Sequence, residues 1–230
     1  MSHTVIVTGG TGGLGSAVVE AFLEEGHRVV VPWLDERERE RLEPRDGLDL
    51  VQADLFDPAA VDAVVERATS RDDAPLRAVA NLVGGFAAGG RVHETPVEEF
   101  EEQFRLNLRA TYLVTAAALP HLLAAGGGAI VCVGTRAALR PFPGAAGYIA
   151  SKHAVLALVE ALDVEYRDDG VRANAILPSV IDTPANRAAN PGADFSKWVE
   201  PAEIARVIRF LCSDDAAVTS GAAIPVYGRA

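Results

Sequence analysis

Tyr148 and Lys152 are the two residues of this sequence whose types and spacing most directly indicate chemistry. They stand four positions apart in the run Tyr148-Ile149-Ala150-Ser151-Lys152, and residues four apart on a helix share a face. A phenol with an ordinary pKa of about 10 is a poor proton donor at neutral pH. A nearby ammonium group stabilises the phenolate and lowers that pKa. The pair therefore predicts an acid–base site in which Tyr148 gives or takes the proton.

A second signal is the glycine-rich run Thr8-Gly9-Gly10-Thr11-Gly12-Gly13-Leu14-Gly15, which follows an apolar run and opens a helical pattern. Glycine lets a backbone turn approach a pyrophosphate, and the helix N-terminus then faces the phosphates. No Gly-Lys-Ser/Thr follows, which argues against an ATP-hydrolysing P-loop. The run predicts a dinucleotide site whose binding residues are Gly9, Thr11, Gly13, Leu14 and Gly15.

Two further positions bear on the adenosine half of a dinucleotide. An acid at the end of the second strand would bind the ribose 2′-hydroxyl of NAD, and an arginine would accept the 2′-phosphate of NADP. Trp33 occupies this position and does neither, although its ring can pack on the adenine. The acids Asp35 and Glu36 and the base Arg37 follow, which leaves NAD(H) or NADP(H) open with a slight preference for NAD(H). Asp54 either accepts a hydrogen bond from the adenine amine or caps a helix or turn.

Together these motifs make the sequence similar to the short-chain dehydrogenase/reductase family over nearly its whole length. Thr8, Gly9, Gly13 and Gly15 match the family's glycine turn, and Tyr148 and Lys152 match its Tyr-x-x-x-Lys pair. The resemblance implies that Tyr148 donates the proton and that Lys152 also binds the nicotinamide ribose. It implies further sites at the positions that match the family: Asn107 supporting a proton relay, Asn81 and Gly84 near the cofactor, and Pro178, Ile181 and Thr183 at its nicotinamide end.

The sequence departs from that family at two places. The family's catalytic serine lies thirteen residues before the tyrosine, where this chain has Thr135. Its hydroxyl can still hydrogen-bond a substrate oxygen, so Thr135 is a catalytic candidate, although threonine is also an ordinary residue at the end of a strand. Asn81-Leu82-Val83-Gly84 replaces the usual Asn-Asn-Ala-Gly, a change expected to alter a backbone contact rather than the fold.

Segments near residues 182–198 are similar to those of quinonoid dihydropteridine reductases, a branch that works without the usual serine. The family resemblance implies an NAD(P)-dependent oxidoreductase that moves hydride between nicotinamide and a small carbonyl or quinonoid substrate. Two alternatives remain: a catalytically weak nucleotide-sensing protein on the same fold, and a less favoured S-adenosylmethionine methyltransferase, which leaves the Tyr–Lys pair without a role.

Short apolar runs alternate with helical patterns along the chain, which predicts one α/β domain of the Rossmann type over residues 1–230 with about seven parallel strands and helices on both faces. The expected strands are Thr4–Thr8, Arg28–Pro32, Asp49–Gln52, Ala78–Val83, Ala129–Val133, Arg172–Leu177 and Ala222–Val226. The expected helices lie near Gly13–Glu25, Pro58–Ser70, Pro96–Leu123, Gly147–Arg167 and Pro201–Leu211.

Two segments do not follow this alternation. Residues 84–95 are rich in glycine and alanine, and residues 178–201 hold four prolines. Both follow strands, at the edge where open α/β sheets bind ligands, and we expect residues 178–201 to form an irregular substrate lid. Residues 35–41 alternate in charge, which is typical of a solvated helix face.

Composition excludes several other functions. The formal net charge is −11, which argues against sequence-independent binding of nucleic acid. The two cysteines, Cys132 and Cys212, are 80 residues apart, which fits neither a disulfide framework nor a zinc cluster. We expect no metal site, no targeting segment, no membrane span and a cytoplasmic location. The apolar helices near 96–123 and 147–167, which form subunit interfaces in the resembled family, predict a homodimer or homotetramer.

Overall fold

The structure is a computed structural model that describes residues 2–229. Its seven strands are β1 (Thr4–Thr8), β2 (Arg28–Trp33), β3 (Leu48–Gln52), β4 (Leu76–Asn81), β5 (Gly128–Val133), β6 (Val171–Pro178) and β7 (Ala223–Val226). All adjacent strands pair in parallel, in the order β3-β2-β1-β4-β5-β6-β7. The strand order reverses between β1 and β4, so the carboxyl ends of these two strands flank the crevice in which such sheets bind ligands.

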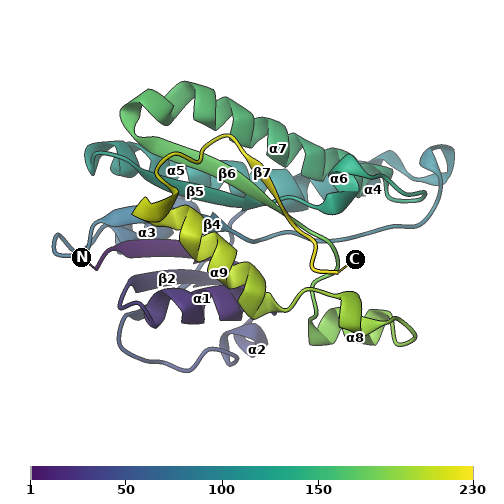
Figure 1. Cartoon of the computed structure of the whole chain (residues 1–230), viewed down its shortest axis with the longest axis horizontal. Coiled ribbons are helices and arrows are strands. Elements are labelled where there is room, and N and C mark those ends of the chain that lie inside the picture. The colour runs from purple at the N-terminus through teal and green to yellow at the C-terminus, as the bar shows by residue number, and fades with distance from the viewer. Residues whose placement is uncertain (1, 230) are drawn as a thin grey trace.

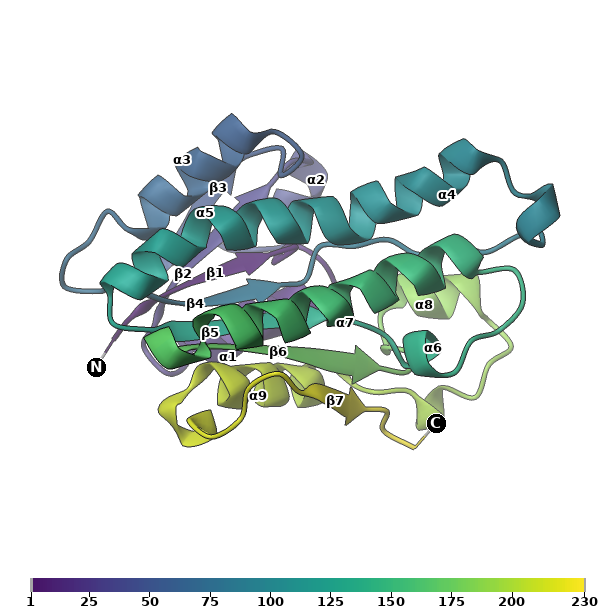
Figure 2. The same cartoon turned by 90° about the horizontal axis from the view of Figure 1, so that it is seen from above.

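Helices cover both faces of the sheet (Figures 1 and 2). They are α1 (Gly15–Leu23), α2 (Glu36–Arg39), α3 (Pro58–Ala68), α4 (Val97–Phe104), α5 (Ala110–Ala124), α6 (Arg136–Leu139), α7 (Ala146–Tyr166), α8 (Pro184–Ala189) and α9 (Pro201–Cys212). One buried cluster joins the sheet to α3, α5 and α7, and a second joins its other face to α1 and α9. The central strands are buried on both faces, which explains their continuously apolar sequences. The expected α/β class and its strand order of Rossmann type are confirmed.

The helical stretch expected near Pro96–Leu123 is confirmed, but it is not α-helical throughout. A π-helical turn, Arg105–Arg109, separates α4 from α5. Within it the side-chain amide of Asn107 donates a hydrogen bond to the carbonyl oxygen of Gln103 (3.1 Å). A π turn shifts the backbone hydrogen-bond pattern of a helix by one residue and is often found at functional sites. Here the Asn107 side chain supplies a hydrogen bond to one of the backbone carbonyl groups in the turn.

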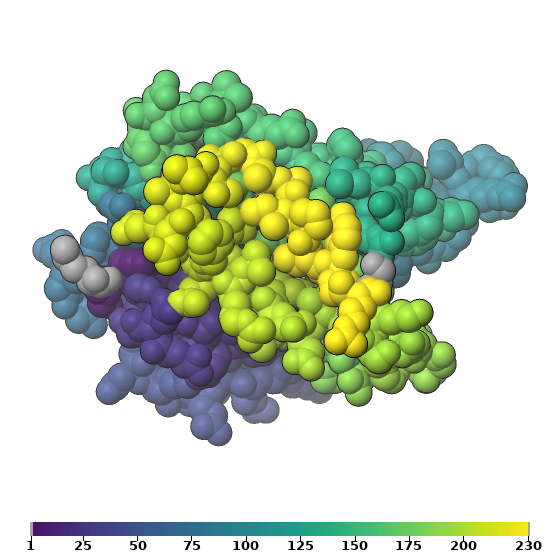
Figure 3. All heavy atoms as spheres, viewed as in Figure 1, coloured from purple at the N-terminus to yellow at the C-terminus, as the bar shows by residue number. Residues whose placement is uncertain are grey.

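The expectation that residues 178–201 are irregular is also partly wrong. The segment contains α8 and a single helical turn, Phe195–Lys197, and Ile181 forms an isolated parallel bridge with Val199. Thr183 caps α8 by accepting a hydrogen bond from the backbone N–H of Asn186 (3.2 Å). Figure 1 shows α8 beyond the carboxyl edge of the sheet, at the same end of the molecule as α6. The space-filling view shows the C-terminal segment lying over α9 and reaching toward α8 (Figure 3).

Candidate active site

The glycine turn after β1 is held in a conformation that needs glycine. Gly9 has φ +65°, and a Cβ on Gly13 would lie 2.8 Å from the Cγ2 of Thr183. A Cβ on Gly15 would collide with the carbonyl oxygen of Gly9. Among the residues described, no side chain caps the N-terminus of α1 at Leu14, although the Ser16 N–H already donates to the carbonyl oxygen of Gly12 (2.9 Å). The positive end of the helix dipole therefore faces the glycine turn without a side-chain acceptor. These observations fit a bound pyrophosphate at the turn.

Thr8 ties this turn to the loop that follows β4. Its hydroxyl oxygen accepts hydrogen bonds from the backbone N–H groups of Leu82 (3.0 Å) and Val83 (3.3 Å). The two strands flank the point where the strand order reverses, and this bridge fixes their ends relative to one another. The side chain of Asn81, in contrast, is buried and donates a hydrogen bond to the Thr115 hydroxyl (3.0 Å). Any contact of Asn81 with a cofactor therefore falls to its backbone.

Tyr148 and Thr135 meet at the carboxyl edge of β5. Thr135 is the N-cap of α6, where its hydroxyl oxygen accepts the backbone N–H of Ala137 (3.2 Å), and its side chain is near enough to the Tyr148 hydroxyl to lower the pKa of the phenol. Burial raises the pKa of Tyr148 above its ordinary value, and Thr135 acts in the opposite direction. Burial and Thr135 are the influences that act on the phenol in this structure, and the lowering of its pKa by Lys152 that the sequence predicts stays a prediction.

Lys152 lies on the same face of α7 and is almost fully buried, at 5% exposed. Its Nζ donates a hydrogen bond to the carbonyl oxygen of Val133 (2.9 Å), and burial lowers the pKa of the ammonium to about 8. Gly84 lies against it, since a Cβ there would be 2.9 Å from Nζ and 2.6 Å from the Oδ1 of Asn107. A side chain at residue 84 would therefore have to displace the end of the Lys152 or the Asn107 side chain.

Asn107 connects three segments of the site. Its Oδ1 accepts the backbone N–H of Gly85 (3.0 Å), and its Nδ2 donates to the hydroxyl of Ser151 (3.2 Å) as well as to Gln103. Ser151 in turn donates to the carbonyl oxygen of Tyr148 (2.9 Å). Asn107 therefore holds the loop after β4 against the first turns of α7. Sequence reasoning missed Ser151, whose only signal was its place between Tyr148 and Lys152 on one helix.

Other predicted cofactor residues lie at the same edge of the sheet. Trp33 ends β2 and packs beneath the guanidinium of Arg39, 5.8 Å from the ring centroid. Asp54 follows β3 and accepts a hydrogen bond from the backbone N–H of Phe56 (2.9 Å). Of the two interpretations of Asp54, the structure supports the turn cap. Pro178 ends β6.

The start of the lid segment lies against the glycine turn. Thr183 contacts the turn at Gly13, because a Cβ placed on Gly13 would lie only 3.0 Å from the Cβ of Thr183. Ile181 pairs with Val199, and its carbonyl oxygen accepts a hydrogen bond from the Nδ2 of Asn186 (2.8 Å). Thr183 thus lies beside the glycine turn, and the contact of Ile181 and Thr183 with the nicotinamide end of a cofactor stays a prediction.

The aromatic side chains divide into two groups. Phe86 meets the Tyr148 ring edge-on at 4.9 Å and lies 6.4 Å from Phe142, and both phenylalanines are exposed. Phe195 and Trp198 instead pack on one another at 4.7 Å inside the lid segment. Phe86 therefore borders the Tyr148 phenol, whereas Phe195 and Trp198 pack within residues 178–201.

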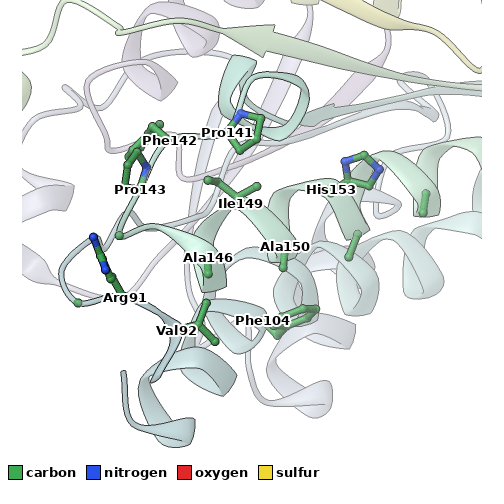
Figure 4. A pocket seen from close by; sticks show the side chains of 14 residues that line it. Arg91, Val92, Phe104, Pro141, Phe142, Pro143, Ala146, Ile149, Ala150 and His153 are labelled. Atoms are coloured by element: carbon green, nitrogen blue, oxygen red, sulfur yellow. The ribbon is translucent and has the colours of Figure 1, made fainter. Parts of the chain in front are cut away.

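The outward face of α7 carries a different feature. Ile149, Ala150 and His153 line an open apolar depression with a volume of about 870 Å³, with Phe104 on one side and Pro141 on the other (Figure 4). The Tyr148–Lys152 face of the same helix points into the protein, so this depression is separate from the acid–base residues. Within residues 2–229, no group of three or more histidine, cysteine or acidic side chains is arranged to hold a metal. In the same range no helix has the length and apolarity needed to cross a membrane.

Comparison with known proteins decides the family. A family model described as Enoyl-(Acyl carrier protein) reductase matches residues 9–228. The chain is 33% identical to 2-(R)-hydroxypropyl-CoM dehydrogenase of Xanthobacter autotrophicus over 99% of its own length and 98% of that protein. It is 30% identical to a solved short chain dehydrogenase/reductase family protein, with a TM-score of 0.87 over 98% of this chain and 96% of the other. The chain is a short-chain dehydrogenase/reductase.

The protein is accordingly an NAD(P)-dependent oxidoreductase. A further solved structure, ElxO with NADP bound, shares the fold at a TM-score of 0.91 and 24% identity, covering 99% of this chain and 98% of the other. The short-chain dehydrogenase/reductase resemblance drawn from the sequence motifs is confirmed.

Proposed function

We propose that the protein interconverts a small alcohol and the corresponding carbonyl compound, with Tyr148 as the proton donor and acceptor. The convergence of Tyr148, Thr135 and Lys152 at the crevice carries this proposal, because all three lie within one short stretch of the sheet's carboxyl edge. When bound, the nicotinamide supplies or accepts the hydride. The nucleotide-sensing alternative gains no support from a site in which these groups are assembled for proton transfer.

Each side chain has a distinct part in this proposal. Tyr148 exchanges a proton with the substrate oxygen, and Thr135 hydrogen-bonds the phenol and orients the substrate oxygen beside it. Lys152 places a positive charge beneath the site and binds the nicotinamide ribose. Asn107 positions the loop at Gly84 and Gly85 against α7, and a relay of protons through it to Lys152 stays a prediction. Asn81, Pro178, Ile181 and Thr183 are proposed to contact the cofactor.

The substrate is proposed to have an apolar body. Phe86 is 64% exposed and meets the phenol edge-on, and Phe142, which lies beside Phe86, is 44% exposed. An apolar ligand at the phenol would cover the exposed ring of Phe86. Residues 178–201 are proposed to close over it as a lid on a single domain spanning residues 1–230. The likeness of that lid to quinonoid dihydropteridine reductases makes a quinonoid acceptor a second substrate class for the assay below.

We further propose NAD(H) as the preferred cofactor, a homodimer or homotetramer, and a cytoplasmic location. Residues 35–41 hold four acids and three arginines, which favours a ribose hydroxyl over a phosphate. The apolar depression on the outward face of α7 supports an interface with a second subunit. Cys132 and Cys212 are buried free thiols, which suits a reducing compartment.

The test is the oxidation of NADH and NADPH, followed by absorbance, against aldehydes, ketones and a quinonoid dihydropterin. Tyr148→Phe removes the proton donor and should lower kcat by about 10²- to 10⁴-fold, while the affinity for nucleotide stays close to that of the wild type. Tyr112→Phe, an exposed tyrosine on α5, is the matched control and should leave kcat unchanged. Near-wild-type turnover by a folded Tyr148→Phe enzyme would refute the proposal.

A further inference from the structure

Helix α2 places a carboxylate directly against the glycine turn. The Thr11 hydroxyl, only 4% exposed, donates a hydrogen bond to Oε2 of Glu38 (3.2 Å). These residues are 27 apart in the sequence. The predicted solvated, salt-bridged face is confirmed at Glu38, whose side chain is 47% exposed and pairs with Arg41. The same carboxylate in addition reaches back to the loop that would cradle the pyrophosphate.

Two of the three arginines of this segment, Arg39 and Arg41, are already engaged by acids. Arg41 donates from Nη1 to the carbonyl oxygen of Thr11 (3.4 Å), and the same nitrogen lies 3.8 Å from Oε1 of Glu38. Arg39 forms an ion pair with Glu36 (2.5 Å). The arginine that contacts the turn is thus paired with a carboxylate, which reduces its attraction for a phosphate.

Dinucleotide-binding sheets read the adenosine ribose with an acid about 20 residues beyond the glycine turn, or with an arginine when the ribose carries a 2′-phosphate. The position at the end of β2 holds Trp33, which has neither chemistry. Glu38 follows Gly13 by 25 residues, and its carboxylate is beside the turn. The acid missing from the strand end is present on the helix that follows.

We propose that Glu38 is the residue that selects NAD(H) over NADP(H), which rests on the nucleotide-dependent function proposed above. Its carboxylate accepts a hydrogen bond from the adenosine ribose hydroxyl. The same carboxylate holds Arg41, and it would repel a 2′-phosphate placed within a few ångströms. Selectivity comes from one side chain that contributes both attraction to the hydroxyl and repulsion of the phosphate.

Isothermal titration of the full chain with NADH and NADPH tests this without relying on turnover. The wild type should bind NADH about tenfold more tightly than NADPH, a preference of about 1.4 kcal/mol. Glu38→Gln keeps the size of the side chain but removes its charge and frees Arg41. This variant should lower the ratio about tenfold, mainly through tighter NADPH binding.

Glu40→Gln is the matched control, because Glu40 is exposed and forms no side-chain ion pair within the described residues. It should leave the ratio within about twofold, which is well under the 1.4 kcal/mol of a tenfold change. Adding Arg41→Gln to Glu38→Gln should remove the gained affinity for NADPH. That result would show that the freed Arg41 caused the gain, and it would separate this cause from a folding defect in the single variant.

Two outcomes would overturn the inference: equal binding of both nucleotides by the wild type, or an unchanged ratio in Glu38→Gln. If the wild type nevertheless reduces a carbonyl compound with either nucleotide, the proposed function stands and only the role of Glu38 fails. If neither nucleotide binds the folded wild type, both fail together.

Discussion

Two groups of buried titratable side chains lie at opposite edges of the sheet, and their charge states differ at neutral pH. At the carboxyl edge burial lowers the pKa of Lys152 to about 8, and at the amino edge burial lowers the pKa of His3 to about 4. At pH 7 the lysine is therefore buried with its charge, whereas the histidine is buried neutral. The first arrangement opposes folding and the second does not.

The surroundings of the two groups differ as well. Lys152 faces the segment at Gly84 and shares its neighbourhood with Asn107 and Tyr148. His3 and His27 stack on each other at 3.8 Å, and His3 Nε2 and His27 Nδ1 have no hydrogen-bond partner among the residues described. A lowered pKa is common to both, so it does not identify a functional site. A charge retained at a cost beside converging polar groups is the more informative sign.

The largest effect is expected from Lys152→Met. The lowered pKa of the lysine corresponds to about 3 kcal/mol of opposition to folding at pH 7, and loss of its hydrogen bond to Val133 offsets about 1 kcal/mol of that. We expect the variant to lose most of its activity and to unfold at higher urea concentration, with a gain of about 2 kcal/mol. Urea unfolding and turnover on one preparation measure both effects.

The gain should shrink with rising pH. Between pH 8 and 10.5 the unfolded lysine still binds a proton that the folded one has released, so wild-type stability rises across this window. Lys197→Met replaces the other lysine, which is exposed, and should change neither quantity. If Lys152→Met were less stable than the wild type at pH 7, the charged lysine at the carboxyl edge would not oppose folding, and the two edges of the sheet would not differ in this respect.

An intermediate effect is expected from Asn107→Ala. The substitution removes the acceptor of the Gly85 N–H and the donor to Ser151 in a fully buried place. Each unpaired group costs about 1–3 kcal/mol, so both the free energy of unfolding and kcat should fall. Asn190→Ala, at an exposed site on the lid, is the control. Unchanged stability and kcat in Asn107→Ala would show that the network does not position the site.

The smallest effect is expected from His3→Phe. This substitution should leave activity unchanged and alter only the decrease of folding stability at acidic pH. Its folded pKa lies below its unfolded value of 6.5, so the unfolded state binds more protons between about pH 6.5 and 4 and stability falls across that window. Its neighbours act in both directions, because His27 and Arg77 lower the pKa of His3 and Asp214 raises it.

Thermal unfolding from pH 7 to 4 measures this prediction. The wild type should lose stability more steeply than His3→Phe, and the exposed His93→Phe should follow the wild type. If His3→Phe abolished turnover at neutral pH, the amino edge would have a functional part that its neutral, stacked histidines do not suggest.

The sequence determined the features that depend on neighbours along the chain. Alternating apolar runs and helical patterns predicted the α/β fold with about seven parallel strands, because the periodicity of each segment reports how that segment is buried. The glycine turn was recognisable because Gly9 and Gly15 belong to one short run of the sequence. Tyr148 and Lys152 were predicted to share a helix face from their spacing alone. Thr135 was located by its distance from Tyr148 along the sequence.

The tertiary structure decided what depends on residues far apart in the chain. Lys152 acquires its lowered pKa, and Tyr148 its raised one, because packing removes them from water, and no local pattern reports burial of that kind. The meeting of Glu38 with Thr11 requires β2 and α2 to return to the end of β1. An alternating charge pattern looks the same whether one of its acids faces solvent or a binding loop, so only the folded chain distinguishes them.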